Sequence, residues 1–283
     1  MAPLTDGSRR RYSSVGTMDQ GPRVVRSALI NAVLALVIAV GVVACHTLVP
    51  TDPARIPEYV GTHGKFSKPA GPGPFPAVVI MHGCGGPPGH QEWIGRLNDW
   101  GYATYYLDSF GPRNLTHVCA EQQFKGYERV DDAYAALAHL RTRGDVRPDR
   151  IGLIGFSHGA AATASVVRAD NAAKANMPPF AAAVAYYGGC RNEKFRLATD
   201  LLILFGEADD WANVKACPRM MERQDKATKD RLIIVTYPGA YHDFDIGPRP
   251  PREYLGHHIE YNEGAAKDSF ERTKAFFERR LKN

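Results

Sequence analysis

One serine of this sequence stands in a setting that can turn a hydroxyl into a nucleophile. The motif GFSHG at residues 155–159 places a glycine two residues before and two residues after Ser157. This pattern is typical of a sharp strand-to-helix turn, where a Cβ at either glycine position would collide with the turn. Such a turn presents the hydroxyl at the positive N-terminus of the helix, where it can attack a carbonyl carbon and form an acyl intermediate. A glycine-flanked serine in an ordinary loop is the alternative.

An attacking serine needs a base that accepts its proton and an acid that orients the base. When the serine occupies a strand-to-helix turn of this kind, the chain order is serine, acid, histidine. The motif GEADDW at residues 206–211 follows the strand-like run LLILF, so an acid here would lie at the carboxyl end of a strand and face Ser157. We predict Asp209 as this acid, with Asp210 as its main rival and Glu207 as a more distant one.

His242 is the predicted base. It lies in YPGAYHDF at residues 237–244, in the loop after the last predicted strand, where an imidazole can reach the serine. It would act first as a general base and then as a general acid. His257 and His258 are later alternatives, but no predicted strand precedes them, so we expect them at the surface.

Backbone N–H groups must stabilise the negative oxygen that forms when a nucleophile attacks a carbonyl. The motif HGCGG at residues 82–86 follows the buried run AVVIM, and its glycines let the backbone approach a substrate. We predict that the N–H groups of Cys84 and His158 form this oxyanion hole, each contributing roughly 3 kcal/mol. A thiol nucleophile at Cys84 is the alternative, but Cys84 lacks the strand-to-helix turn that surrounds Ser157.

Short β-rich runs alternate with helical segments from residue 57 onward, which indicates a mostly parallel sheet with helices on both faces. Together with the serine turn, this predicts an α/β-hydrolase fold in one catalytic domain, residues 57–283. Little sequence remains for a lid, so we expect an open site. The predicted strands cover residues 77–81, 102–107, 150–155, 181–187, 200–205 and 231–237. The predicted helices cover residues 93–100, 121–143, about 158–168, 214–226 and 264–281.

Residues 1–45 have the features of an export signal. Arg23 and Arg26 precede an apolar run, residues 28–44, that ends at Cys45. The approach VVAC is similar to the cleavage site of bacterial lipoproteins, whose cysteine is lipidated and becomes the mature N-terminus. We predict lipidation at Cys45 and a location in the bacterial cell envelope or periplasm.

An uncleaved signal anchor and plain secretion are the alternatives to lipidation, and all three export the domain. Contact with the membrane would then come from the N-terminal lipid or the anchor. Residues 46–56 include Pro50 and Pro53 and are predicted to be a linker. Met18 lies just upstream of the basic pair and is an alternative start for the leader.

The composition argues against nucleic-acid, metal and nucleotide partners. Of the formal net charge of +5, the five arginines and two aspartates of residues 1–44 supply +3, so the remainder is nearly neutral. The 10 histidines show no H-E-x-x-H or comparable spacing, so we predict no metal. The glycine-rich segments lack a G-x-x-x-x-G-K-[ST] phosphate loop, so we predict no nucleotide cofactor.

Export would place the other four cysteines in an oxidising compartment, where disulfides form. Three pairings are possible for Cys84, Cys119, Cys190 and Cys217. We favour Cys84 with Cys119 and Cys190 with Cys217, because each pair would join loops that follow neighbouring strands at one edge of the sheet. Buried free thiols are the alternative.

Five motifs together resemble the dienelactone hydrolase family: HGCGG, DSFGPR at 108–113, GFSHG, GEADDW and YPGAYHDF. They occur in the family's order, and the resemblance spans residues 57–283. It implies a single α/β-hydrolase domain that acts on small-molecule esters or lactones without a cofactor. The enzymes that named the family carry a cysteine as nucleophile, whereas this chain has Ser157, which favours a general carboxylesterase.

Arginines bind a substrate carboxylate in the enzymes that named the family, and Arg113 is the candidate here. We favour a surface or salt-bridged arginine over this role. The same serine, acid and histidine could also serve a peptidase or a polyester depolymerase. Outside catalysis, the alternative is an envelope lipoprotein that binds a ligand through a vestigial site.

The leader generates a direct prediction. Cells that express the full chain with radioactive palmitate should incorporate label into the protein, because a lipoprotein cysteine becomes acylated. The Cys45→Ser variant should incorporate none. Equal labelling of both proteins, or of neither, would contradict lipidation at Cys45.

Overall fold

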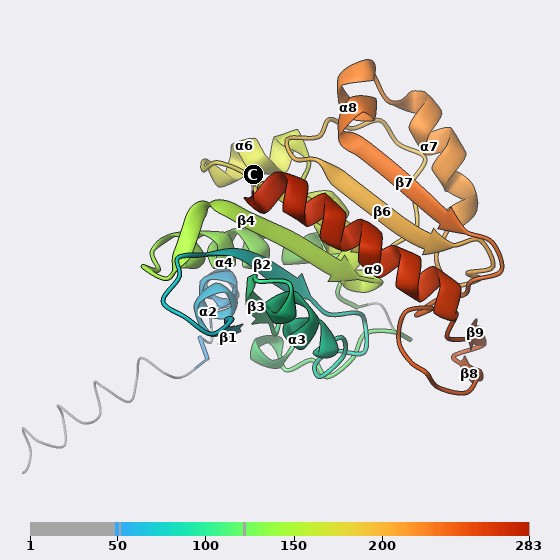
Figure 1. Cartoon of the computed structure of the whole chain (residues 1–283), viewed down its shortest axis with the longest axis horizontal. Coiled ribbons are helices and arrows are strands. Elements are labelled where there is room, and N and C mark those ends of the chain that lie inside the picture. The colour runs from blue at the N-terminus through green and yellow to red at the C-terminus, as the bar shows by residue number, and fades with distance from the viewer. Residues whose placement is uncertain (1–48, 51, 121–122, 283) are drawn as a thin grey trace, which may run out of the picture. The chain divides into compact units, whose positions relative to one another are not determined.

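The computed structural model describes residues 49–50, 52–120 and 123–282, and a seven-stranded sheet runs through them (Figure 1). The strand order is β1-β3-β2-β4-β5-β6-β7. Only β1 is antiparallel to its neighbour, so the predicted α/β-hydrolase architecture is confirmed. The strands are β1 (Lys65–Ser67), β2 (Phe75–Met81), β3 (Ala103–Leu107), β4 (Val146–Phe156), β5 (Ala182–Tyr186), β6 (Leu201–Gly206) and β7 (Leu232–Tyr237).

Helices cover both faces of this sheet (Figure 1). One face packs against α2 (Ile56–Thr62), α4 (Val130–Arg141), α5 (His158–Val166), α6 (Ala169–Ala175) and α7 (Cys217–Arg223). The other packs against α3 (Glu92–Asp99) and α9 (Glu263–Phe277). The remaining helix is α8 (Lys226–Arg231). Short 3₁₀ turns are η1 (Pro53–Arg55), η2 (Gly111–Arg113), η3 (Gly126–Arg129) and η4 (Val214–Ala216), and the π-helical turn η5 (Glu278–Lys282) ends the described chain.

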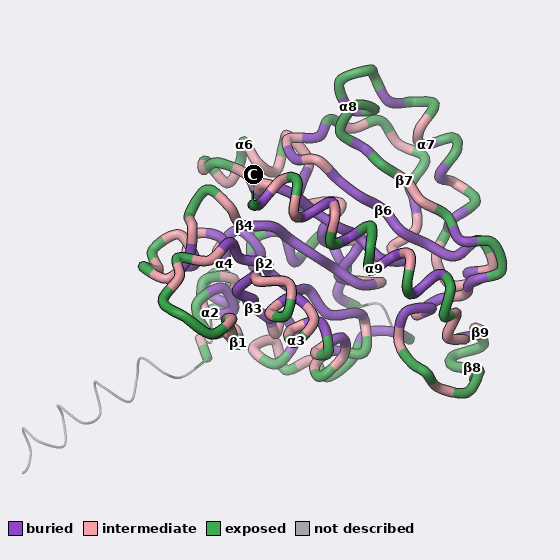
Figure 2. Tube along the Cα trace, viewed as in Figure 1, coloured by how far each residue is buried: buried purple, intermediate pink, exposed green. Residues whose placement is uncertain are grey.

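The strand β2 shows why the sequences of the central strands are continuous apolar runs. Its residues Val79 and Met81 belong to the core on one face, and Val78 and Ile80 belong to the core on the other. All four side chains are fully buried. Alternate residues of a strand point to opposite faces, so a strand covered on both faces is apolar at every position. Figure 2 shows the same burial along the neighbouring central strands.

The helix predicted at residues 121–143 is shorter in the structure. Residues 121–122 lie outside the described chain, Lys125 is extended, and the α-helix begins only at Val130. The 3₁₀ turn η3 precedes α4 and packs closely on the start of α5: a Cβ at Gly126 would lie 2.8 Å from the carbonyl oxygen of His158.

Other boundaries also differ from the prediction. The helix predicted at about 158–168 is α5, which ends at Val166, and the following helix α6 was not predicted. The linker expected at 46–56 already contains η1 and the first residue of α2. A two-stranded hairpin, β8 (Arg252–Tyr254) and β9 (His257–Ile259), was not predicted. Its strands have three residues each, too few to show an alternating pattern.

Two disulfides cross-link loops at the carboxyl edge of the sheet. Cys84 pairs with Cys119, and Cys190 pairs with Cys217. The first bond joins the loops after β2 and β3, and the second joins the loops after β5 and β6. This is the predicted pairing, and disulfides are typical of exported proteins.

The predicted export segment and Cys45 lie outside the described residues. In the part of the chain that the structure does describe, no helix has the length and apolar character needed to cross a bilayer.

The disulfide between α7 and the loop after β5 should contribute measurably to stability. Replacing both Cys190 and Cys217 by serine should lower the free energy of unfolding by about 3 kcal/mol, because the bond closes a loop of 27 residues in the unfolded chain. Urea unfolding followed by circular dichroism measures this difference. An unchanged unfolding midpoint, or two reactive thiols at these positions in the native protein, would argue against the bond.

Candidate active site

The turn around Ser157 is held by contacts that only glycine permits. Ser157 joins β4 to α5 with φ 50° and ψ −112°, a conformation that non-glycine residues rarely adopt. A Cβ at Gly155 would lie 2.2 Å from the carbonyl oxygen of Gly159, and a Cβ at Gly159 would lie 2.2 Å from that of Met81. The Ser157 N–H donates to the carbonyl of Tyr186 at 2.9 Å. The packing therefore explains both glycines of the motif.

A chain of hydrogen bonds links the three residues that the sequence singled out. Ser157 Oγ lies 2.9 Å from His242 Nε2, and His242 Nδ1 lies 2.8 Å from Asp209 Oδ2. A carboxylate only accepts, so Nδ1 carries the proton and Nε2 offers its lone pair to the serine hydroxyl. Asp209 Oδ1 accepts the backbone N–H groups of Trp211 and Ala212, each at 2.9 Å, so the carboxylate cannot rotate freely.

The surroundings make His242 a stronger base than a free imidazole. Its side chain is almost fully buried, which by itself lowers the pKa. The hydrogen bond to Asp209 and the charge of Asp243 act in the opposite direction, with a further contribution from Asp245, and the pKa is raised above 6.5 overall. The ring also packs against Tyr187 and Trp211, with ring centroids 4.8 and 5.1 Å away.

The rival residues are engaged elsewhere. Asp210 faces His257 at 3.3 Å, and Glu207 accepts a hydrogen bond from Thr236 at 2.6 Å. His258 lies between Glu253 and Glu260. Both histidines are partly exposed on β9 and are preceded by the unpredicted strand β8.

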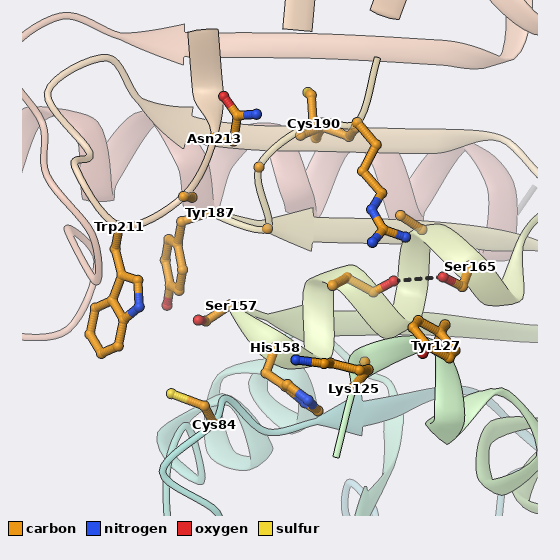
Figure 3. Close-up of a pocket in the computed structure, with 18 of the residues that line it drawn as sticks. Cys84, Lys125, Tyr127, Ser157, His158, Ser165, Tyr187, Cys190, Trp211 and Asn213 are labelled. Atoms are coloured by element: carbon orange, nitrogen blue, oxygen red, sulfur yellow. Dashed lines mark hydrogen bonds between the residues drawn. The ribbon is translucent and has the colours of Figure 1, made fainter. Parts of the chain in front are cut away.

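The two residues predicted to form the oxyanion hole line the cavities beside the serine. His158 is the first residue of α5, and Cys84 lies in the loop after β2 (Figure 3). Among the described residues, neither N–H donates to a backbone carbonyl. The loop at Cys84 is held from its other side, because its carbonyl accepts the N–H of Val118 at 2.8 Å and its sulfur bonds Cys119.

Cavities lie on two sides of Ser157. One, of about 320 Å³, runs over α5 and has a floor of small residues with aromatic walls, among them Ala161, Ala164, Gly188, Phe124 and Phe195. The other, of about 420 Å³, lies toward the hairpin β8–β9 and is lined by residues that include Gly85, His90, Arg249, Arg252 and Tyr254. Both are bounded by Cys84, Ser157, Trp211 and His242.

No sequence motif pointed to the residues that pack behind His242. Tyr187 is fully buried at the end of β5 with φ 43°, and its hydroxyl lies 3.0 Å from His90 Nε2. Burial raises the pKa of Asp245 to about 7, and Trp93 Nε1 donates to this carboxyl at 3.2 Å. His90 and Tyr187 are 97 residues apart in the sequence, so only the folded chain brings them together.

Arg113 does not reach the site and is salt-bridged, which is the reading that the sequence favoured over its candidate role in substrate binding. Its guanidinium makes two hydrogen bonds to the fully buried carboxylate of Asp132, at 2.7 and 3.0 Å. A third bond, at 2.8 Å, goes to the carbonyl of Ser109. Neither cavity beside Ser157 is lined by Arg113. Burying Asp132 requires a cationic partner, and this need fixes the arginine.

Comparisons with known proteins identify a family and related chains. A model of the dienelactone hydrolase family matches residues 63–281. The esterase EstD of Thermotoga maritima is 33% identical over 120 residues, a match that spans 40% of this chain and 28% of that protein. This chain therefore aligns with less than a third of the length of that relative.

Solved structures share the fold at low sequence identity. A putative dienelactone hydrolase from Klebsiella pneumoniae has a TM-score of 0.60 and 22% identity, over 77% of this chain and 95% of that one. A dienelactone hydrolase-like promiscuous phosphotriesterase from metagenomic libraries has a TM-score of 0.62 and 21% identity, over 77% and 92%. The family match extends from the residues before β1 to the end of α9, and on this ground the chain belongs to the dienelactone hydrolase family.

Proposed function

We propose that this protein hydrolyses carboxylic esters through an acyl-enzyme intermediate on Ser157. The observation that carries the proposal is the hydrogen-bonded chain from Ser157 Oγ through His242 to Asp209, set on a strained strand-to-helix turn. Strained backbone is retained where packing enforces it and is concentrated at functional sites. Membership of a hydrolase family supports the same reading.

The first half of the reaction transfers the acyl group to the enzyme. As Ser157 Oγ bonds the carbonyl carbon, its proton passes to His242 Nε2, and the C=O electron pair moves to the oxygen. The N–H groups of Cys84 and His158 donate to that oxyanion. When the carbonyl re-forms, the ester C–O bond breaks and the leaving alkoxide takes the proton from His242.

Water completes the cycle. His242 accepts a proton from a water molecule, whose oxygen attacks the acyl carbon, and the Ser157–acyl bond then breaks as His242 returns the proton to Oγ. Asp209 stays ionised throughout and stabilises the imidazolium. No cofactor takes part in this sequence.

The two cavities favour substrates with a group on each side of the scissile bond. The cavity over α5 combines small and aromatic residues with the charged Arg168 and Glu193 and has room for an acyl or aryl chain. The cavity beside β8–β9 presents polar side chains. Lactones present the same carbonyl chemistry. A panel of esters, lactones, anilides and polyesters separates an esterase from a peptidase or depolymerase.

We also propose that the protein is exported. The disulfides support an oxidising compartment. In this arrangement residues 1–45 direct export, with Cys45 as the lipid-bearing residue, residues 46–56 link the anchor to the catalytic domain, and residues 57–283 carry the chemistry.

The nucleophile is tested by Ser157→Ala. This variant should lose p-nitrophenyl acetate turnover by at least about 10⁴-fold, because removal of a catalytic serine leaves only the oxyanion hole and binding. It should also stop reacting with a fluorophosphonate probe. Ser67→Ala is the matched control, since Ser67 lies on the edge strand β1, donates to Asn98 Oδ1 at 2.6 Å and lines neither cavity beside Ser157. Ser157→Ala with wild-type turnover refutes the proposal.

The pH dependence of the reaction measures the ionisation of the His242 imidazole. We expect kcat/KM for p-nitrophenyl acetate to rise with pH through one ionisation whose midpoint lies above 6.5, because only the neutral imidazole accepts the serine proton. Asp243→Asn should move the midpoint to lower pH, since it removes a charge that raises the pKa of His242.

Asp210→Asn is the control for this profile, because the Asp210 carboxylate faces His257 instead. Its midpoint should coincide with that of the wild type. A wild-type midpoint at or below 6.5, or equal shifts in both variants, would show that His242 is not the titrating base.

A further inference from the structure

Arg129 is a cation buried behind the site, between η3 and α4. Its side chain has no exposed surface, and among the described residues no carboxylate lies within 4 Å of it. One of its nitrogens, Nη2, is buried without a hydrogen-bond partner in the same part of the chain. The buried carboxylate of Asp132 offsets this charge at longer range, and a buried cation without a direct carboxylate contact still costs stability.

The other two nitrogens of Arg129 reach three separate loops. Nη1 donates to the carbonyl of His82 at 2.7 Å and lies 3.2 Å from His158 Nδ1, and Nε donates to Ser109 Oγ at 3.1 Å. His82 stands two residues before Cys84 in the chain, and His158 follows Ser157. One guanidinium therefore contacts both loops whose amides face the reacting carbonyl.

The bonds at His158 fix the form of its imidazole. Nε2 lies 2.7 Å from the carbonyl of Phe124, which only accepts, so Nε2 carries the proton and Nδ1 accepts from Arg129. Burial, together with the charge of Arg129, lowers the pKa of His158 to about 4. The ring is thus neutral at neutral pH, and its tether to Arg129 persists there.

We propose that Arg129 is a positioning residue of the oxyanion hole, which sets the spacing of the Cys84 and His158 amides through the His82 carbonyl and the His158 imidazole. This inference rests on the proposed hydrolase function. Arg129 lines neither cavity and touches no reacting atom. Figure 3 shows the two residues that it aligns, Cys84 and His158, next to Ser157. Oxyanion donors act only within a few tenths of an ångström of their correct position, so a shift of either loop lowers the rate.

Arg129→Lys tests the proposal, because lysine keeps the charge but cannot bond both loops with one planar group. We expect kcat for p-nitrophenyl acetate to fall by about tenfold or more with KM within about twofold, since a misplaced donor affects only the transition state. Arg141→Lys is the matched control. Arg141 lies at the other end of α4 and holds the carbonyls of Pro148 and Pro178, at 3.1 and 2.8 Å. Its kcat should stay within about twofold of the wild type.

A tetrahedral inhibitor provides a readout that loss of stability does not mimic. Phenylboronic acid accepts a lone pair from Ser157 Oγ at boron, the serine proton passes to His242, and a boronate oxygen enters the oxyanion hole. In Arg129→Lys its inhibition constant should rise by the factor by which kcat/KM falls. In Arg141→Lys it should be unchanged.

His158→Asn is the second variant, and it decides the question if Arg129→Lys does not fold. It removes the imidazole that Arg129 holds but keeps the backbone amide, so kcat should fall while KM stays. The double variant should lose less than the product of the two single losses, because both changes break one tether.

Normal wild-type turnover with an unchanged kcat in Arg129→Lys or His158→Asn would overturn the role of Arg129 alone. An increase in KM with an unchanged kcat, or an equal fall of kcat in Arg141→Lys, would overturn it as well. A wild-type protein that reacts with neither ester nor fluorophosphonate would contradict the proposed function, and the role of Arg129 with it.

Discussion

The backbone strain at Ser157 is the constraint on which the rest of the structure depends. A residue with a Cβ adopts φ 50° only where its surroundings leave no alternative. Those surroundings are the contact of Gly159 with β2, the contact of Gly155 with α5, and the bond from the Ser157 N–H to β5. The position of the Ser157 hydroxyl at the edge of the sheet therefore depends on the correct pairing of β2, β4 and β5.

The electrostatics of the site follow from the same crowding. Burial alone would weaken His242 as a base, but it also makes the bond to Asp209 act in a medium of low dielectric constant. Two backbone N–H groups hold the second oxygen of Asp209, so the carboxylate stays aligned without help from solvent. The result is a base whose pKa lies above that of free imidazole, although it is nearly excluded from water.

The position of a site residue could be predicted from the sequence wherever the residue follows the end of a strand. Ser157 and Asp209 follow runs of buried residues, and His242 follows the partly exposed edge strand β7. The carboxyl ends of parallel strands share one edge, so the proximity of these three residues could be predicted. The contacts that the arginine side chains make in the fold could not be predicted in this way. Arg113 and Arg129 lie 16 residues apart in similar polar sequence, and only the position of Asp132 directs the first to an ion pair and leaves the second among loop carbonyls.

Two disulfide bonds, and not a covering lid, restrain the loops around this site. The loops after β2 and β3 are joined by one disulfide, and the loops after β5 and β6 by another, and both bonds border the cavity over α5. The hairpin β8–β9 adds a wall on the opposite side. Loops fixed in this way need no ordering when a substrate binds, which removes part of the entropic cost of catalysis. An open cleft and restrained loops around Ser157 are therefore compatible in this fold, because the disulfides are in place before a substrate arrives.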